Sequence, residues 1–334
     1  MTRVAVIGAG VGAMAHLKAL RELDWPVLAV ATRRAERAAA VRELHPDARV
    51  CWPADDVFDA GPDLVIVASP ADAHLDGVRL AAARGVDVIV EKPLHARLDQ
   101  AEELVEVAAK AGIGLAVCLQ HRAKPAGLAL KALVGELGGL IGGSVSVPWW
   151  RPQSYYDEPG RGTYARDGGG VLMTQAIHAL DLFLSVVGAP VRVLCAAGRT
   201  AAHRMEAEDV VAGVLDYGQG RLVSLYATVA QYPGRTEELT VAGTSGTGVL
   251  HGSRLVRYPS AEVLMDGAAS SASADPAALP VEWHAALIAD AAEAFAAGRE
   301  PLASGRSALV TQRVIAAVYQ SGALGGWVDV QVRS

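Results

Sequence analysis

The chain has 334 residues, of which 51% are hydrophobic and 20% charged, and its formal net charge is -6 at pH 7. A chain of this length usually needs more than one hydrophobic core, so we expect two domains. The acidic balance argues against nucleic acid or an anionic membrane surface as the main partner and leaves a small-molecule substrate.

No apolar run approaches ~18 residues, and residues 1–7 lack the pattern of a secretory leader. We therefore expect no membrane span and interpret the protein as cytoplasmic. The cysteines Cys51, Cys118 and Cys195 lie far apart without metal-ligand spacing. They suit reduced thiols, and we predict no metal site.

A short apolar strand, residues 4–7, leads directly into a glycine-rich turn that opens a helix. The first glycine of such a turn allows tight folding, the second lets the backbone approach a pyrophosphate, and a small sixth residue permits close packing of helix on strand. The helix N-terminus offers free N–H groups to the anion. The residues predicted to hold a dinucleotide here are Gly8, Gly10, Val11, Gly12 and Ala13.

The second strand, residues 27–31, ends in Thr32, Arg33 and Arg34, with Arg37 following. An acidic residue at this position would bind the ribose 2′-OH of NAD, whereas guanidinium groups match a 2′-phosphate. We therefore favour NADP(H), with NAD(H) as the alternative. In that alternative the arginines are the solvated start of a helix.

Two further buried strands end in polar residues. Residues 64–68 lead into Ser69 and Pro70, which we expect beneath the nicotinamide, and then to His74, which suits either a cofactor contact or a structural role. Residues 86–90 end in Glu91 and Lys92 before a proline. Because ligands bind at the carboxyl ends of parallel strands, Lys92 is the first catalytic candidate; the alternative is a solvated strand end. A last strand, residues 113–119, completes a doubly wound Rossmann domain of residues 1–121.

The second half, residues 122–334, changes character. Residues 149–156 mix aromatic rings with guanidinium and amide donors, as a sugar-binding loop or a subunit interface would. A helix predicted over residues 171–187 places Thr174, His178 and Asp181 on one face. Taken alone, His178 is more typical of a satisfied core histidine.

From residue 191 onward, repeated alternating strands predict a large, mostly antiparallel open sheet. We expect an α+β domain whose open sheet is covered by helices and a second subunit, and hence a homodimer or homotetramer. Residues 266–280 are predicted to be a mobile surface loop, followed by helices over residues 282–297 and 305–320.

Taken together, these motifs resemble the glucose-fructose oxidoreductase, inositol dehydrogenase and rhizopine-catabolism family (Gfo/Idh/MocA). The resemblance covers essentially the whole chain and is nearest to the nucleotide-sugar and amino-sugar dehydrogenases, through residues 150–156 and 161–163. The motifs that carry it are Gly8-Ala9-Gly10 with His16, Ala68-Ser69-Pro70 with His74, Glu91-Lys92-Pro93-Leu94, Gln120-His121-Arg122, Asp167-Gly168-Gly169-Gly170 with His178 and Asp181, and Gly243-Thr244-Ser245-Gly246.

The resemblance implies that Lys92 and His178 form the catalytic pair, with Lys92 holding the substrate oxygen and His178 moving its proton. Many relatives carry an aspartate where this chain has Thr174, and a hydroxyl cannot stabilise an imidazolium as a carboxylate would. Further cofactor contacts are expected at Glu91, Lys92, Gln120 and Arg161, and further substrate contacts at Arg122, Arg151, Tyr156, Arg161, Thr174 and Gln175.

The leading hypothesis is an NADP(H)-dependent oxidoreductase acting on a secondary alcohol or ketone of a sugar, sugar nucleotide or cyclitol. One alternative is a non-catalytic partner or regulator that senses the cofactor. Another is a dehydrogenase or imine reductase of a carboxylate-bearing substrate, which arginines such as Arg122 and Arg151 also suit.

Overall fold

The structure is a computed structural model of the chain, and it describes residues 1–267 and 280–331. The chain divides into two compact units. Unit 1 comprises Met1–Ala123 with Pro280–Leu309, and unit 2 comprises Lys124–Leu279 with Val310–Ser334. The sequence-based division assigned everything after residue 121 to the second domain, whereas residues 280–309 fold with unit 1. The chain returns because this stretch contributes a helix to the cover of the first sheet.

Unit 1 is built on a parallel sheet of six strands in the order β3-β2-β1-β4-β5-β6. The order reverses direction between β1 and β4, which makes that point the switch of a doubly wound sheet. Both strands at the switch are fully buried, as their continuous apolar runs predict. The strands are β1 (Val4–Ile7), β2 (Val27–Ala31), β3 (Arg49–Cys51), β4 (Leu64–Val67), β5 (Asp87–Val90) and β6 (Leu115–Val117).

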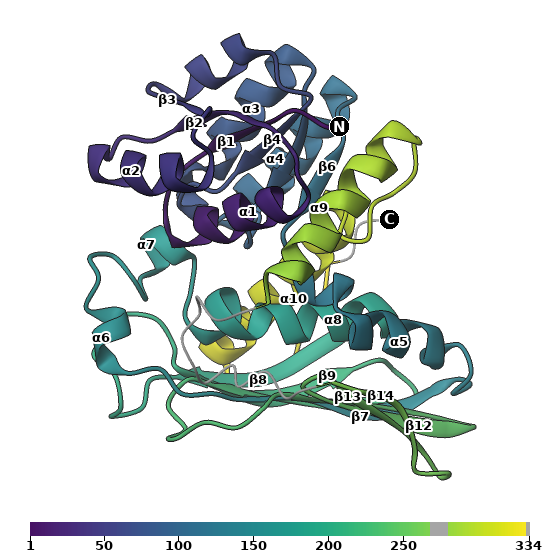
Figure 1. Ribbon diagram of the computed structural model, residues 1–334. Coiled ribbons are helices and arrows are strands. Elements are labelled where there is room, and N and C mark those ends of the chain that lie inside the picture. The colour runs from purple at the N-terminus through teal and green to yellow at the C-terminus, as the bar shows by residue number, and fades with distance from the viewer. Residues whose placement is uncertain (268–279, 332–334) are drawn as a thin grey trace. The chain divides into compact units, whose positions relative to one another are not determined.

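Helices cover this sheet (Figure 1): α1 packs against α2 and α9, and α3 packs against α4. Helices α3 and α4 each end at a left-handed glycine, Gly85 and Gly112, which stops the helix before the next strand. The bounds are α1 (Val11–Glu22), α2 (Ala35–Leu44), α3 (His74–Arg84), α4 (Leu98–Ala111) and α9 (Val281–Ala296), with the short 3₁₀ turns η1 (Ala54–Ala60), η2 (Ala71–Ala73) and η3 (Gln120–Ala123).

Unit 2 is built on a sheet of nine strands in the order β14-β13-β12-β11-β7-β10-β9-β8-β15. Only β7 and β10 pair in parallel; the other neighbours are antiparallel. The strands are β7 (Leu140–Pro148), β8 (Arg192–Gly198), β9 (Val210–Asp216), β10 (Leu222–Thr228), β11 (Glu238–Gly243), β12 (Gly246–His251), β13 (Arg254–Tyr258), β14 (Glu262–Asp266) and β15 (Val328–Asp329).

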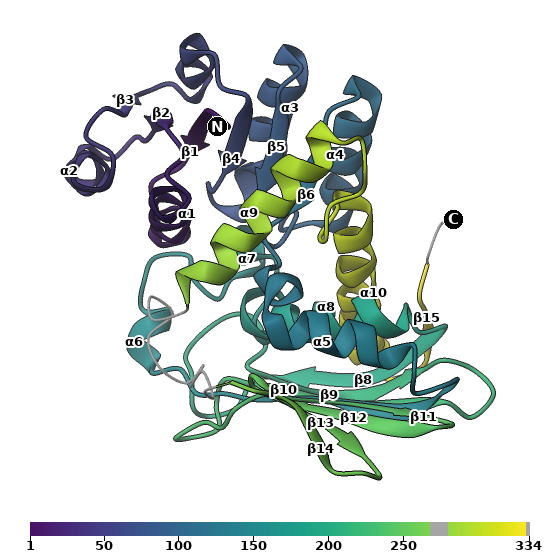
Figure 2. The ribbon, with the colours of Figure 1, turned by 45° about the vertical axis from the view of Figure 1, so that its right-hand side comes forward.

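One face of this sheet carries helices: Figure 2 shows α5 and α8 lying along it. Along β10, Val223 and Leu225 are buried toward the helices, while Leu222, Ser224 and Tyr226 alternate with them and are exposed. Among the described residues, the sheet is therefore buried on one face and open on the other along β10. The helical elements are α5 (Pro125–Val134), α6 (Gln153–Tyr156), α7 (Tyr164–Asp167), the π turn η4 (Leu172–Ala176), α8 (Ile177–Val187) and α10 (Gly305–Leu324), which begins in unit 1.

By length and composition, the stretch Tyr164–Val187 could span a membrane, but 78% of its most apolar window is buried within the structure. This is the pattern of a core helix. Among the described residues no second stretch passes the same test.

The predicted fold class is confirmed, with local differences. The sequence patterns missed β3, which is only three residues long, and β14, whose exposed residues do not alternate. The helix predicted over residues 171–187 is divided into a π turn and an α-helix. Most of the loop predicted at residues 266–280 lies outside the described residues.

Candidate active site

The glycine-rich turn of unit 1 joins β1 to α1 at the switch of the sheet. Gly8 has a φ of +111°, and its backbone N–H donates to the Ala31 carbonyl at 2.9 Å. A Cβ on Gly8 would overlap the Ala68 carbonyl at the end of β4. Only glycine can therefore occupy this point, where the chain passes between the ends of β2 and β4.

The N-terminus of α1 is open to an anion. Gly10 caps it without a side-chain hydrogen bond, the first turn carries no acidic residue, and a Cβ on Gly10 would meet nothing within 4 Å. Val11 is exposed and Ala13 is buried against the sheet. Free N–H groups beside open space are what a pyrophosphate needs.

Glu91 lies at the carboxyl end of β5, beside this turn; a Cβ on Gly12 would lie 3.7 Å from its side chain. The Glu91 Oε1 and His16 Nε2 atoms are 2.8 Å apart, and Glu91 Oε2 accepts the Lys92 backbone N–H at 3.0 Å. Burial alone would raise the pKa of Glu91, but the hydrogen bond and charge of His16 and the charge of Lys92 lower it to about 2. Glu91 is therefore an anion that anchors the segment carrying Lys92.

His74 connects that segment to the end of β4. Its Nδ1 lies 3.0 Å from the Pro93 carbonyl and its Nε2 lies 2.9 Å from the Ser69 carbonyl. Burial lowers the pKa of His74. The Ser69 hydroxyl oxygen is buried and has no hydrogen-bond partner among the described residues, as expected for a group that meets a ligand. Pro70 follows at the start of η2.

The end of β2 carries the predicted 2′-phosphate residues. The Thr32 Oγ1 accepts the Arg34 backbone N–H at 3.1 Å, and Thr32 donates its own N–H to the Cys51 carbonyl at 3.0 Å. Arg33 is exposed, and its guanidinium carbon lies 5.0 Å from the ring centroid of Trp52. Arg37 follows in the first turn of α2. Trp52 was missed in the sequence, because the strand that places it there was itself not predicted.

The residues after β6 are buried. Gln120 accepts a weak contact from the Cys118 Sγ at 4.0 Å. The Arg122 guanidinium donates to the Leu302 carbonyl at 3.1 Å and to the Ser307 Oγ at 2.7 Å, all within unit 1. Arg122 therefore attaches the returning stretch of chain to the sheet, and its substrate role stays a prediction.

The fold also brings together three side chains from separate elements. Ligand atoms of His16, Glu91 and Cys118 lie within 4.8 Å of one another. Burial and the Glu91 carboxylate raise the pKa of the Cys118 thiol well above its ordinary value. In the absence of a cation the thiol therefore retains its proton.

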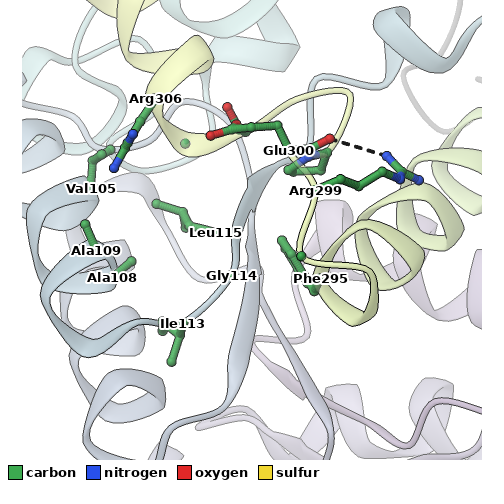
Figure 3. A pocket seen from close by; sticks show the side chains of 14 residues that line it. Val105, Ala108, Ala109, Ile113, Gly114, Leu115, Phe295, Arg299, Glu300 and Arg306 are labelled. Carbon is green, nitrogen blue, oxygen red and sulfur yellow. Dashed lines mark hydrogen bonds between the residues drawn. The ribbon is translucent and has the colours of Figure 1, made fainter.

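A cavity of about 250 Å³ lies elsewhere in unit 1, between α4, the start of β6 and the turn into α10 (Figure 3). Val105 and Arg306 lie at one end of it and Phe295 at the other. Gly114 and Leu115, at the amino end of β6, form part of its wall. The cavity therefore lies at the amino ends of the strands, whereas the dinucleotide turn lies at their carboxyl ends. None of the predicted site residues lines the cavity.

In unit 2, Tyr155 is the centre of the polar aromatic loop that the sequence predicted around residues 149–156. Its hydroxyl oxygen accepts from Arg161 at 2.8 Å and from the Gln175 amide at 3.4 Å, and the guanidinium groups of Arg151 and Arg161 lie over its ring. Arg161 also pairs with Glu158. The sequence analysis selected the adjacent Tyr156. Because both tyrosines belong to one short helix, the sequence offered no signal to choose between them.

Tyr156 itself is 6% exposed and packs against His203. Burial raises its pKa. The two ring nitrogens of His203 lie 2.9 Å from Asp209 and 2.8 Å from the Arg151 carbonyl. Tyr156 thus forms the base of the loop on which Arg151, Tyr155 and Arg161 stand.

The segment that precedes His178 is held by a buried carboxylate, Glu208. It accepts the backbone N–H groups of Gly170 at 2.8 Å and Leu172 at 3.1 Å and the Tyr319 hydroxyl at 2.9 Å. A Cβ on Gly170 would overlap the Glu208 backbone. Three glycines therefore let the chain pass close to β9 before the π turn, and Glu208 satisfies the N–H groups exposed there.

Thr174 and Gln175 lie in that π turn, and His178 is the second residue of α8, which follows it. The Thr174 hydroxyl donates to the Gly170 carbonyl at 2.6 Å and also contacts Gln175. His178 is 7% exposed. The Asp181 Oδ1 accepts from Thr311 at 2.7 Å, deep in unit 2. A π turn within a helix frequently marks a functional site.

The predicted residues thus form two groups. Unit 1 holds the predicted cofactor residues and the catalytic candidate Lys92: the glycine turn, Thr32 to Arg37, Ser69 to His74, Glu91, Lys92, Gln120 and Arg122. Arg151, Tyr156, Arg161, Thr174, Gln175 and His178 belong to unit 2. A doubly wound sheet with a dinucleotide turn, followed by an α+β unit with a polar aromatic loop, defines a nicotinamide-dependent oxidoreductase.

Comparison with known proteins agrees. The family described as "Oxidoreductase family, NAD-binding Rossmann fold" matches residues 2–118, and the "GFO/IDH/MocA C-terminal domain" matches residues 129–249. The chain belongs to the GFO/IDH/MocA oxidoreductase family, and the predicted resemblance is confirmed.

The chain is similar to D-apiose dehydrogenase of Paraburkholderia graminis, with 27% identity over 98% of this chain and 89% of the relative. It is 27% identical to D-xylose 1-dehydrogenase (NADP(+)) 2 of Haloferax volcanii, over 96% of this chain and 97% of the relative. Its fold is similar to that of the WlbA dehydrogenase from Bordetella pertussis in complex with NADH and UDP-GlcNAcA, with 25% identity, a TM-score of 0.85, and coverage of 99% and 98% of the two chains. The prediction of an enzyme of the dehydrogenase class is confirmed.

Proposed function

We propose that the protein is an NADP(H)-dependent dehydrogenase or reductase acting on a secondary alcohol or ketone carbon of a sugar, sugar nucleotide or cyclitol. The relatives support this substrate class: two are named for the sugars D-apiose and D-xylose, and the WlbA structure holds UDP-GlcNAcA. The observation that carries the proposal is Lys92, which follows the partly buried anion Glu91 at the carboxyl end of β5, beside the dinucleotide turn.

The residues of unit 1 fit a nicotinamide dinucleotide. The uncapped N-terminus of α1 suits its pyrophosphate, and the unpaired Ser69 hydroxyl lies at the end of β4. Thr32, Arg33 and Arg34 replace the carboxylate that would bind a ribose 2′-OH, and they support NADP(H) over NAD(H).

The proposed mechanism assigns one role to each catalytic residue. When bound, the nicotinamide accepts the hydride in alcohol oxidation and supplies it in ketone reduction. The Lys92 ammonium donates a hydrogen bond to the substrate oxygen and stabilises negative charge as it develops. His178 takes the hydroxyl proton during oxidation and returns it during reduction. The Thr174 hydroxyl donates to a carbonyl and carries no charge that could stabilise an imidazolium.

The role of Lys92 is tested with the variant Lys92→Ala. The purified variant is titrated with NADPH and assayed with NADP⁺ against a panel of sugars, sugar nucleotides and cyclitols. We expect turnover to fall by at least about 10³-fold while NADPH affinity changes little, because the ammonium acts on the substrate oxygen. Lys110→Ala, at an exposed lysine of α4, is the matched control. Turnover retained in Lys92→Ala would remove Lys92 from the mechanism.

The same panel decides between the alternatives. A wild-type protein that binds NADPH but oxidises and reduces nothing would favour a cofactor-sensing partner. Turnover limited to amino-acid-like or imine substrates would favour a carboxylate-bearing substrate held by arginines such as Arg122 and Arg151.

We also propose a homo-oligomer that forms through the open face of the unit 2 sheet. The exposed Leu222 and Tyr226 on this face support the proposal, because apolar side chains on the central strands of an uncovered sheet favour association.

A further inference from the structure

Trp52 is a large, half-exposed aromatic residue at the edge of unit 1 where the cofactor's adenosine half is expected. Trp52 directly follows β3, and 49% of the surface of this residue is exposed. The hydrogen bond from Thr32 N–H to the Cys51 carbonyl brings the ends of β2 and β3 side by side. Trp52 and the predicted phosphate-binding residues therefore leave the sheet at neighbouring points.

The indole of Trp52 lies against Arg33. The guanidinium carbon is 5.0 Å from the ring centroid, which is within cation–π distance. Two carboxylates that follow Trp52 in the chain pair with other cations: Asp55 with Arg84 at 2.7 Å and Asp59 with Arg49 at 3.4 Å. Among the described residues no carboxylate pairs with Arg33, so its N–H donors stay available to an anion.

We propose that Trp52 is a positioning residue for cofactor specificity, holding the Arg33 guanidinium over the end of β2 so that it favours the 2′-phosphate of NADP(H). This inference depends on the NADP(H) preference proposed above. A free arginine loses rotamer freedom when it binds a phosphate, and an arginine already stacked on a ring loses less. The flat guanidinium leaves its N–H edges directed outward, which is the geometry that phosphate oxygens accept.

The test is calorimetric titration of the full chain with NADPH and NADH, using Trp52→Ala, Trp52→Phe, Arg33→Ala and the double variant. We expect Trp52→Ala to weaken NADPH binding about three- to fivefold and NADH binding less than about twofold, as loss of one exposed cation–π contact predicts. Trp52→Phe should retain most of the affinity. The double variant should bind NADPH no more weakly than Arg33→Ala, because both changes remove one interaction.

A matched control lies in unit 2, where Arg192 stacks on the partly exposed Trp327 at 4.5 Å. Trp327→Ala removes a similar pair and should leave both affinities unchanged. Equal weakening of NADPH and NADH in Trp52→Ala would overturn the specificity role and make Trp52 an adenine platform. If the wild-type protein shows no preference for NADPH over NADH, the proposed NADP(H) specificity is wrong. If the wild-type protein prefers NADPH and Trp52→Ala keeps that preference, only the role of Trp52 is refuted.

Discussion

Two buried histidines and a partly buried glutamate of unit 1 lie in contact beside the proposed cofactor site. The His16 ring is hydrogen-bonded to Glu91. It also makes an edge-to-face contact with the His284 ring at a centroid distance of 5.5 Å. Burial, and then the adjacent His16, lower the pKa of His284 to about 4. Folding therefore favours neutral His284 together with ionised Glu91.

From this cluster we predict that the folded protein loses stability in mildly acidic solution. Between pH 6.5 and 4 the unfolded chain protonates His284 while the folded chain does not, so stability falls as pH is lowered through this window. At pH 5 the loss is about 2 kcal/mol relative to pH 7. The contribution of Glu91, with its lowered pKa, is lost only below about pH 4.5.

The measurement is the free energy of urea unfolding at pH 7 and pH 5. His284→Asn should remove most of the pH dependence in this window, whereas His251→Asn, at an exposed position of β12, should leave it as in the wild type. An unchanged slope in His284→Asn would assign the acid lability to other groups.

At the scale of elements, the segment from Gly170 to the start of α8 depends on a partner distant in sequence. Glu208 binds two of its N–H groups and Tyr319 from α10. The close approach is available only to glycine at position 170. The π turn that carries Thr174 and Gln175 is therefore held from outside the helix.

We predict that Glu208→Ala destabilises unit 2 by about 3 kcal/mol, because two buried N–H groups and a hydroxyl lose their acceptor. Turnover should fall as well, since the start of α8 carries His178. Chemical unfolding and steady-state kinetics measure the two effects. Glu206→Ala, at an exposed glutamate two residues away, is the control. Wild-type stability in Glu208→Ala would show that water replaces the carboxylate.

At the scale of the whole molecule, the helices of residues 1–267 and 280–331 that pack on the nine-stranded sheet cover one of its faces. Ser224 stands at the centre of the open face on β10, between the exposed Leu222 and Tyr226. A small residue there permits a second sheet to approach closely.

We predict that the wild-type protein sediments as a dimer or tetramer and that Ser224→Arg shifts it toward monomer, because a buried, unpaired guanidinium would oppose association. Analytical ultracentrifugation measures the change, and circular dichroism confirms the fold. Leu128→Arg, at an exposed position of α5, is the control. A wild-type monomer, or a Ser224→Arg variant with unchanged mass, would contradict the proposed interface.

Local patterns were sufficient for much of the fold and for part of the site. Apolar runs bounded by glycine and proline predicted five of the six strands of unit 1, and the turn from Gly8 to Ala13 lies at the switch of the sheet as expected. The roles of Arg33, Lys92 and His178 remain predictions, since they depend on a ligand.

The sequence by itself determined what depends on neighbours along the chain: the periods of helices and strands, the glycine turn and the polar strand ends. Only the tertiary structure decided what depends on distant contacts. It brought Pro280–Leu309 back to unit 1, set Trp52 beside Arg33, made Tyr155 rather than Tyr156 the accepting hydroxyl, and placed Glu208 against Gly170. Each of these contacts joins residues that are distant in sequence or, for Tyr155 and Tyr156, separates two chemically similar neighbours, and local propensity determines neither.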